Sequence, residues 1–207
     1  MLFRSRMLLR DEWRAVGLRF EHAPCCSLAL RRQLVDAGVP LKDAPIIYEG
    51  IDIEAYVDEA TQRVDAGPDD ILSVVYVGLL VEHKGVHTAI EALSRLRPEV
   101  LARVHLTILG SGHPEYERRL RELVGATGLD RSVVFASPIP RTALPRFLAG
   151  HHVLVMPSIW EEPLALIMQE ALASGLVLVG SATGGTTEIV VDGENGLLFP
   201  PGDAGRL

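Results

Sequence analysis

Residues 71–96, ILSVVYVGLLVEHKGVHTAIEALSRL, join a strand pattern directly to a helix pattern. The stretch opens with a β-branched apolar run, Ile71–Val77, which lacks polar alternation and ends at Gly78. From Lys84 to Leu96 the apolar residues return at helical spacing, so this part predicts an amphipathic helix. A continuous apolar strand followed by such a helix is typical of a parallel sheet that helices cover on both faces.

The same alternation of strand and helix continues along the chain. We predict strands at Pro45–Tyr48, Ile71–Val77, Val104–Leu109, Ser132–Phe135, Val153–Met156, Leu176–Val179 and Leu197–Phe199. We predict helices at Ser27–Ala37, Lys84–Leu96, Pro114–Leu123, Arg141–Leu148, Pro163–Ala173 and Thr186–Val191. The expected fold is therefore α/β, a Rossmann-like doubly wound parallel sheet of about six strands. Because such sheets bind ligands at the carboxyl ends of their strands, functional residues are expected in the strand-to-helix loops.

Composition excludes some classes of function. Lys and Arg number 20 against 27 Asp and Glu, which gives a net charge of −7. Because nucleic-acid binding needs a basic surface, we expect no nucleic-acid partner. Cys25 and Cys26 are adjacent and cannot easily form a relaxed disulfide, which favours two buried free thiols in a cytoplasmic protein.

The N-terminal segment, MLFRSRMLLRDEWR, has its apolar runs broken by arginines, so it predicts neither a signal peptide nor a membrane span. It fits either an ordinary helix that packs on another part of a protein or an amphipathic helix at the inner face of a membrane. Its apolar side chains predict a contact for self-association or for a partner chain. These side chains are Leu2, Phe3, Met7, Leu8, Leu9 and Trp13.

Several common motifs do not fit the sequence. Gly110-Ser-Gly112 follows a strand but lacks the third glycine of a dinucleotide fingerprint, and residues 78–84 lack the second glycine and the hydroxyl of a phosphate loop. His151 and His152 are adjacent rather than one helical turn apart. We therefore predict no metal site.

Three strand-to-helix loops carry the candidate chemistry. Lys84 begins a helix, where the ammonium group and the helix dipole both attract a phosphate. Glu170 lies in an otherwise apolar helix, where a carboxylate needs a partner or a hydroxyl-bearing ligand. Gly184-Gly185 allows a ligand to approach the backbone closely before a short helix. Taken singly, these features also fit a solvated lysine, a surface-facing glutamate and a flexible turn.

Together the loops resemble those of glycosyltransferase family 4, a group of retaining enzymes with two Rossmann-like domains, known as the GT-B architecture. The Glu-x7-Glu motif of that family corresponds to Glu162 and Glu170 in SIWEEPLALIMQEALASG, residues 158–175. Pro163 is predicted to start the helix of this motif, with Glu162 at its cap. Matching flanks are Pro157-Ser158 before the motif, and Gly184-Gly185, Glu188 and DGENGLLFPPGD after it.

The resemblance implies a role for each candidate residue. Lys84 would bind the donor diphosphate, Glu162 would hold hydroxyls of the donor sugar, and Glu170 would bind the ribose hydroxyls. Ile139 would flank the base, and main-chain amides near Ala165 and Leu166 would approach the sugar and phosphate. Glycines that follow strands complete the donor-binding set. The full set is Gly78, Ile139, Ala165, Leu166, Glu170, Gly184 and Gly185. No cofactor or metal is implied, and the donor would be a UDP- or GDP-linked sugar.

Two positions depart from the family pattern. Leu79 stands where the family usually has an arginine that shares the diphosphate charge with the lysine, and Ala165 stands where it has a glycine. Both changes predict weaker donor binding.

By the same resemblance, residues 1–44 correspond to the end of an acceptor domain with its connecting helix, and residues 45–207 to a donor domain shortened at its C-terminal end.

The resemblance implies retaining transfer of a sugar from a nucleotide diphosphate to a hydroxyl acceptor such as a glycan, lipid or small molecule. The main alternative is an inactive nucleotide-binding module that needs a partner chain, which Leu79 favours. A sugar-nucleotide epimerase or phosphorylase shares the architecture, but the Glu-x7-Glu context disfavours it.

Overall fold

A computed structural model describes residues 23–61, 67 and 70–207 of the chain. Within it, one sheet forms the centre of the molecule. Its strands are β1 Leu72–Val77, β2 Val104–Leu109, β3 Val133–Ala136, β4 Val153–Met156, β5 Val177–Ser181 and β6 Gly196–Phe199. They lie in the order β3-β2-β1-β4-β5-β6, and every neighbouring pair is parallel. The predicted Rossmann-like α/β fold is confirmed.

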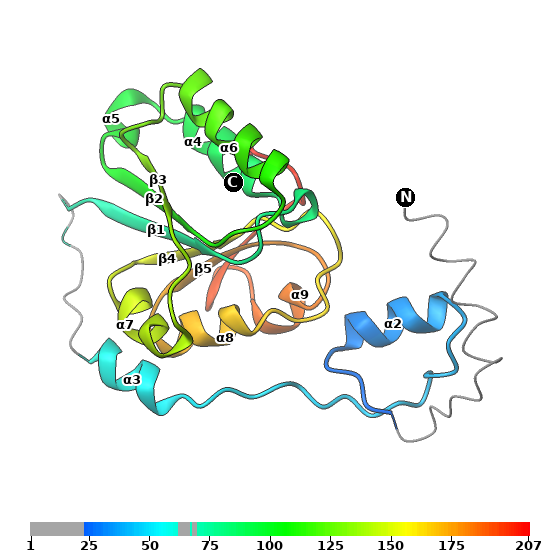
Figure 1. The fold of residues 1–207 in the computed structure, drawn as a ribbon. Coiled ribbons are helices and arrows are strands. Elements are labelled where there is room, and N and C mark those ends of the chain that lie inside the picture. Colours follow the sequence, from blue (N-terminus) through cyan, green and yellow to red (C-terminus); the bar gives the residue numbers. More distant parts are fainter. Residues whose placement is uncertain (1–22, 62–66, 68–69) are drawn as a thin grey trace.

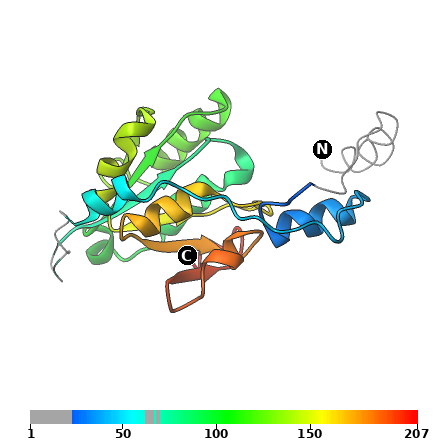
Figure 2. The ribbon, with the colours of Figure 1, turned by 90° about the horizontal axis from the view of Figure 1, so that it is seen from below.

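Helices cover both faces of this sheet (Figure 1). One face carries α4 Val86–Ser94, α5 Pro98–Leu101 and α6 Pro114–Ala126. The other carries α3 Glu54–Ala60, α7 Leu144–Ala149, α8 Leu166–Ala173 and α9 Thr186–Ile189. Two 3-10 turns, η1 Glu82–Lys84 and η2 Arg141–Ala143, precede α4 and α7. Helix α2, Leu28–Asp36, lies beside the domain, at the end where α9 is found (Figure 2).

Strand β1 shows why these sequences need two helical layers. Its side chains alternate between the faces, so Val74 and Tyr76 join the core under α4 and α6, whereas Val75 and Val77 join the core under α7 and α8. Both sets are apolar, and a strand that buries both faces has no position left for polar alternation. The largely apolar run at residues 71–77, in which Ser73 is the one small polar residue, therefore predicts a central strand correctly.

The segment Pro45–Tyr48 was predicted as a strand, and this prediction is wrong. Ile46 makes only an isolated bridge with Cys25, and the segment does not join the sheet. Its neighbours form a small separate cluster made of Cys25, Val39, Leu41 and Ala44. Two backbone bonds, between Cys25 and Pro45 and between Ile47 and Cys25, account for its extended shape.

Helix boundaries differ from the sequence prediction at a few places. Ser27 caps α2 as predicted, since its hydroxyl oxygen accepts a hydrogen bond from the Leu30 amide at 3.0 Å. The short helices α3 and α5 were not predicted, and Pro98 starts α5 instead of only following a helix end. Cys25 is buried and Cys26 half-buried, both as free thiols. The apolar set between Leu2 and Trp13 lies outside the described residues, and the division at residue 44 stays a prediction.

Candidate functional site

The candidate residues gather where the strands end. The loops that follow β1, β4 and β5 all leave the sheet at its carboxyl edge, because the strands are parallel. This places Lys84, at the end of η1, beside the loop before α8 that contains Glu162. The loop contacts are close: a Cβ added to Gly85 would lie 1.9 Å from the Pro157 carbonyl oxygen.

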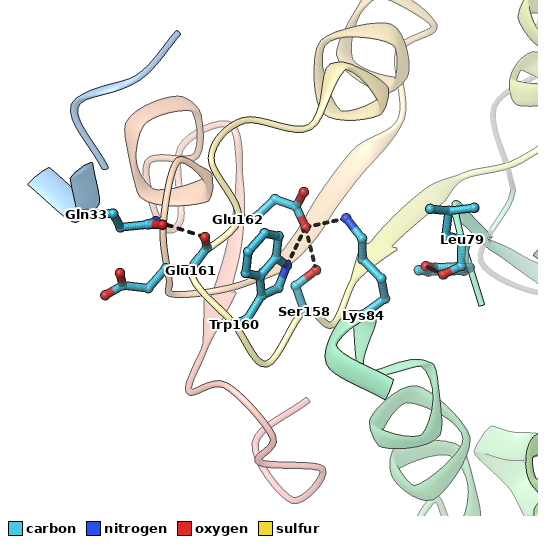
Figure 3. A network of polar contacts seen from close by, with 8 residues as sticks. Gln33, Leu79, Lys84, Ser158, Trp160, Glu161 and Glu162 are labelled. Carbon is cyan, nitrogen blue, oxygen red and sulfur yellow. Dashed lines mark hydrogen bonds and ion pairs between the residues drawn. The ribbon is translucent and has the colours of Figure 1, made fainter. Parts of the chain in front are cut away.

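Glu162 is the centre of a compact polar network (Figure 3). Its Oε2 atom accepts hydrogen bonds from Lys84 Nζ at 2.6 Å, Trp160 Nε1 at 3.1 Å and Ser158 Oγ at 3.2 Å. The carboxylate is nearly withdrawn from solvent, and the lysine that neutralises it is also largely buried. His83 packs edge-on against Trp160, with 5.0 Å between the ring centroids. We call these five residues the Glu162 cluster.

The backbone around Glu162 is fixed by the two glycines of the third loop. The Gly185 amide donates to the Glu162 carbonyl oxygen at 2.7 Å, and a Cβ on Gly184 would lie 2.2 Å from that oxygen. Gly184 also has a φ of +54°, which side chains rarely adopt. The backbone that approaches these glycines most closely here is that of Glu162 and Pro163; approach of a ligand stays a prediction.

The same contact explains where α8 begins. The helix was predicted to start at Pro163, but it starts at Leu166 with Ala165 as its N-cap. The Glu162 carbonyl accepts from the Gly185 amide instead of from a helical amide, and the extended backbone of Ala165 (φ −99°, ψ 114°) keeps the helix from beginning earlier. Ala165 offers no side-chain cap, and no described residue accepts a hydrogen bond from the Leu166 or Ile167 amides. Free amides at a helix start attract anions.

Glu170 is a second buried carboxylate, on α8. Its Oε1 atom accepts a hydrogen bond from the Tyr56 hydroxyl at 2.9 Å and is ion-paired with Nη2 of Arg141. The glutamate is 1% exposed, and no bond reaches its Oε2 from the described residues. Burial, and then the hydrogen bond to Glu170, raise the pKa of Tyr56 to about 12. We call these three residues the Glu170 cluster.

A cavity of about 360 Å³ adjoins this second cluster. It lies at the ends of β1 and β2 and includes Gly78, Leu79, Ile139 and Arg141 in its lining. Leu79 is 62% exposed and lies apart from Lys84 (Figure 3). A second cavity of about 380 Å³ lies on the opposite side of the sheet, but its lining is apolar and contains none of the candidate residues.

Helix α2 is tied to the site from outside the sheet. Glu188, on α9, accepts the amides of Leu28 and Ala29 at 2.9 and 2.7 Å, and so caps the start of α2. Gln33, on the same helix, donates to the Glu161 carbonyl oxygen at 2.9 Å (Figure 3). The loop that carries Glu162 is therefore in contact with a helix far earlier in the chain.

The sequence-predicted residues thus fall into two groups. Lys84 and Glu162 contact each other, with Gly184 and Gly185 behind them. Gly78 and Ile139 line the cavity beside Glu170. The partners missed from the sequence are Ser158, Trp160, Tyr56 and Arg141. Ser158 and Trp160 lie within four residues of Glu162 in the sequence, so their position could have suggested them as its partners. No local pattern connects Tyr56 to Glu170.

Within the described ranges, no three His, Cys, Asp or Glu side chains gather as metal ligands. Nδ1 of His152 contacts the Ser73 amide at 2.9 Å, and Nδ1 of His151 lies 2.8 Å from the Phe147 carbonyl oxygen.

None of the helices in the described part of the chain is both long and apolar enough to cross a membrane.

Comparison with known proteins adds the family. The chain is 34% identical to a glycogen synthase of Mycobacterium tuberculosis over 192 residues, covering 88% of this chain and 42% of that protein. It is 31% identical to a D-inositol 3-phosphate glycosyltransferase of Kribbella flavida, covering 75% of this chain and 38% of that protein. The chain spans about half the length, or less, of the curated relatives it matches.

Solved structures agree. Anabaena Alr3699/HepE in complex with UDP superposes with a TM-score of 0.75 at 26% identity, covering 88% of this chain and 50% of that one. Sucrose-phosphate synthase from Thermosynechococcus elongatus gives a TM-score of 0.72 at 28% identity, covering 88% and 46%. Residues 58–207 match the family profile of glycosyl transferases group 1. The chain therefore belongs to the glycosyl transferases group 1 family.

Proposed function

We propose that this chain supplies the donor site of a retaining glycosyltransferase. The observation that carries the proposal is the pair of buried carboxylates, Glu162 and Glu170, each paired with a cation at the same edge of the sheet. Burying a carboxylate is costly unless a cation and hydrogen-bond donors compensate it, and a compensated pair adds little stability over apolar side chains. Two such pairs at one edge of the sheet are therefore better explained by ligand binding than by stability. The two clusters offer separate places for a sugar and for a nucleoside.

The nucleoside half of the donor is proposed to enter the cavity beside Glu170. Ile139 would flank the base there, and Oε2 of Glu170 would accept hydrogen bonds from the ribose hydroxyls. Alr3699/HepE has been solved with UDP and with UDP-glucose, so a UDP-linked hexose is the first donor to test and a GDP-linked sugar the second.

The sugar and diphosphate are proposed to lie between Lys84, Glu162 and the start of α8. Oε2 of Glu162 already accepts three hydrogen bonds, which leaves Oε1 for hydroxyls of the donor sugar. Lys84 and the free amides at Leu166 and Ile167 would stabilise negative charge on the diphosphate.

The reaction follows from this placement. The bond between the anomeric carbon and the diphosphate oxygen breaks while the acceptor hydroxyl oxygen bonds to the same face of that carbon. Because attack and departure share one face, the configuration is retained, and the acceptor proton passes to the departing diphosphate. Electrostatic stabilisation of the leaving group by Lys84 and the α8 amides is the contribution of this chain. We propose that no metal ion is required for it, and that the hydroxyl acceptor binds to a region beyond this domain.

An alternative is a nucleotide-binding module without catalysis. Leu79 favours it, because an exposed leucine at the cavity leaves Lys84 with less help in holding the diphosphate. Both proposals require nucleotide binding, and only the first requires turnover.

Thermal unfolding with UDP, GDP and ADP tests the shared requirement. The diphosphate that fits the cavity should raise the unfolding midpoint in a concentration-dependent way, because it binds the folded state alone. If none of the three nucleotides shifts the midpoint, the donor-site proposal is wrong. Hydrolysis or transfer from the corresponding nucleotide sugar by the chain together with an acceptor domain then separates an enzyme from an inactive module.

A further inference from the structure

We propose that Arg141 is a displaceable cation of the donor site: it covers Glu170 in the free protein and turns to the donor phosphate when ribose takes its place. The inference rests on the proposed function and adds a binding residue to it. Arg141 comes from η2, outside every motif that led to the site. It is the charged residue among the described residues that line the cavity.

The first step of the argument is the contrast between the two groups that hold Glu170. The Tyr56 hydroxyl is buried with the carboxylate, whereas the Arg141 side chain is 67% exposed. An exposed arginine loses little by moving, because water can solvate its guanidinium group and the long side chain regains freedom. The cost of its departure therefore lies with the buried carboxylate, where Tyr56 stays and keeps Oε1 hydrogen-bonded.

The second step is that departure of Arg141 would not strand a buried charge. A ribose hydroxyl that donates to Oε2 of Glu170 would compensate the carboxylate in place of the guanidinium, which is paired with Oε1. Two donors then remain on the carboxylate, one from Tyr56 and one from the ligand. Without Tyr56 the exchange would leave the buried carboxylate dependent on the ligand alone, which is costly.

The third step concerns where the guanidinium goes. The diphosphate of a nucleotide begins on the same ribose that Glu170 would hold, so it starts within reach of a long side chain rooted at residue 141. At this end of the site Leu79 contributes no charge, and Lys84 is already paired with Glu162. Arginine suits phosphate because its planar donors can bind two oxygens at once. Arg141 would then take the place of the cation that Leu79 does not provide.

Calorimetry with UDP and uridine tests this inference. In Arg141→Gln, UDP affinity should fall by about 10-fold or more, because a charge-assisted contact is lost. Uridine affinity should stay the same or rise, because Glu170 is no longer covered. Arg141→Lys should retain most of the preference for UDP over uridine. Arg146→Gln is the matched control: it removes the same charge from the neighbouring helix α7, outside the cavity lining, and should leave the preference unchanged.

Each other outcome has a distinct meaning. If Arg141→Gln changes UDP and uridine affinity by the same factor, Arg141 does not contact phosphate and the inference is wrong. The same holds if Arg146→Gln lowers the preference as much, since a general charge effect would then explain both. If the unaltered protein binds neither ligand, the donor-site proposal fails first.

Discussion

The Glu162 cluster and the Glu170 cluster solve the same problem in different ways. Each withdraws a carboxylate from solvent and pairs it with a cation. The cation of Glu162 is itself largely buried, with the Lys84 side chain 18% exposed, whereas the Arg141 side chain is 67% exposed. Gly184 and Gly185 also pack against the backbone of the Glu162 loop, whereas Glu170 has a hydrogen bond from one tyrosine, Tyr56. Buried pairing therefore fixes one cluster within the fold, whereas the exposed arginine of the other is the basis of the exchange proposed above.

The largest expected effect comes from removing the buried cation. Lys84→Met leaves Glu162 without a counter-charge, and breaking a buried pair in this way costs about 3–5 kcal/mol of unfolding free energy. Arg141→Met, in the other cluster, should cost less than Lys84→Met, because the exposed guanidinium is partly screened by solvent and Tyr56 still donates a hydrogen bond to Glu170. Urea denaturation at neutral pH measures both. Equal losses would remove the distinction between a fixed and an exchangeable cluster.

A second variant sharpens this test. Replacing the pair together, as Lys84→Met with Glu162→Leu, removes both charges and should recover most of the stability lost in the single variant. If the double variant is as unstable as Lys84→Met alone, the loss comes from packing and not from an uncompensated charge.

The next effect tests the locked backbone. Gly184→Ala places a methyl group 2.2 Å from the Glu162 carbonyl oxygen in a left-handed conformation, so it should cost about 2–5 kcal/mol. Gly128→Ala is the matched control, because Gly128 has a φ of +68° but open space around it. It should show only the conformational cost, about 1–2 kcal/mol. Similar losses in denaturant unfolding would mean that the loop around Glu162 adapts.

The third effect is on ligand affinity and follows from the proposed roles. Leu79→Arg should tighten UDP binding by about 10- to 150-fold and leave uridine binding unchanged, because only the diphosphate presents charge. Glu170→Ala should weaken both ligands, because ribose is common to them. Calorimetry on the two variants decides this. No change of UDP affinity in the first, together with no change of either ligand in the second, would contradict the donor site.

The smallest effect belongs to Tyr56. At neutral pH Tyr56→Phe should cost about 1 kcal/mol, the contribution of one hydrogen bond. Folding raises the pKa of this tyrosine from 10.0 to about 12, so its stabilising effect is complete below pH 10 and is lost as the pH rises through about 12. Unfolding free energies measured between pH 7 and 12 should therefore fall less steeply in Tyr56→Phe. An unchanged slope would show that Tyr56 titrates as it does in the unfolded chain.

The sheet was predictable because its central strands are buried on both faces and carry largely apolar runs without polar alternation, as β1 and β4 do. Pro45–Tyr48 carries a similar apolar run, yet it joins no sheet, since strand propensity alone does not specify a partner. The first residue of α8 was misplaced because a contact with Gly185, distant in the sequence, takes up the Glu162 carbonyl. Local patterns describe local bonds, and this boundary depends on a distant one.

The candidate site shows the same division. Lys84, Glu162 and Glu170 could be identified from motif spacing, but how their charges are balanced could not. Tyr56 reaches Glu170 from α3, a short helix with a polar sequence and no side-chain cap, which nothing in its own composition predicts. The roles proposed for the candidate residues rest on the family resemblance and not on any local pattern.

The order of the strands has a consequence for how the chain folds. Strand β1 pairs with β2 on one side and with β4 on the other, and the second pairing must wait for a much longer loop to close. The cavity-lining residues Gly78 and Leu79 follow β1, whereas Glu162 and Glu170 come after β4. The parts of the site therefore meet only when β1 pairs with β4. If β1 and β4 pair only after the folding transition state, a bound nucleotide should slow unfolding and leave the rate of folding unchanged, which stopped-flow folding and unfolding with and without UDP would measure.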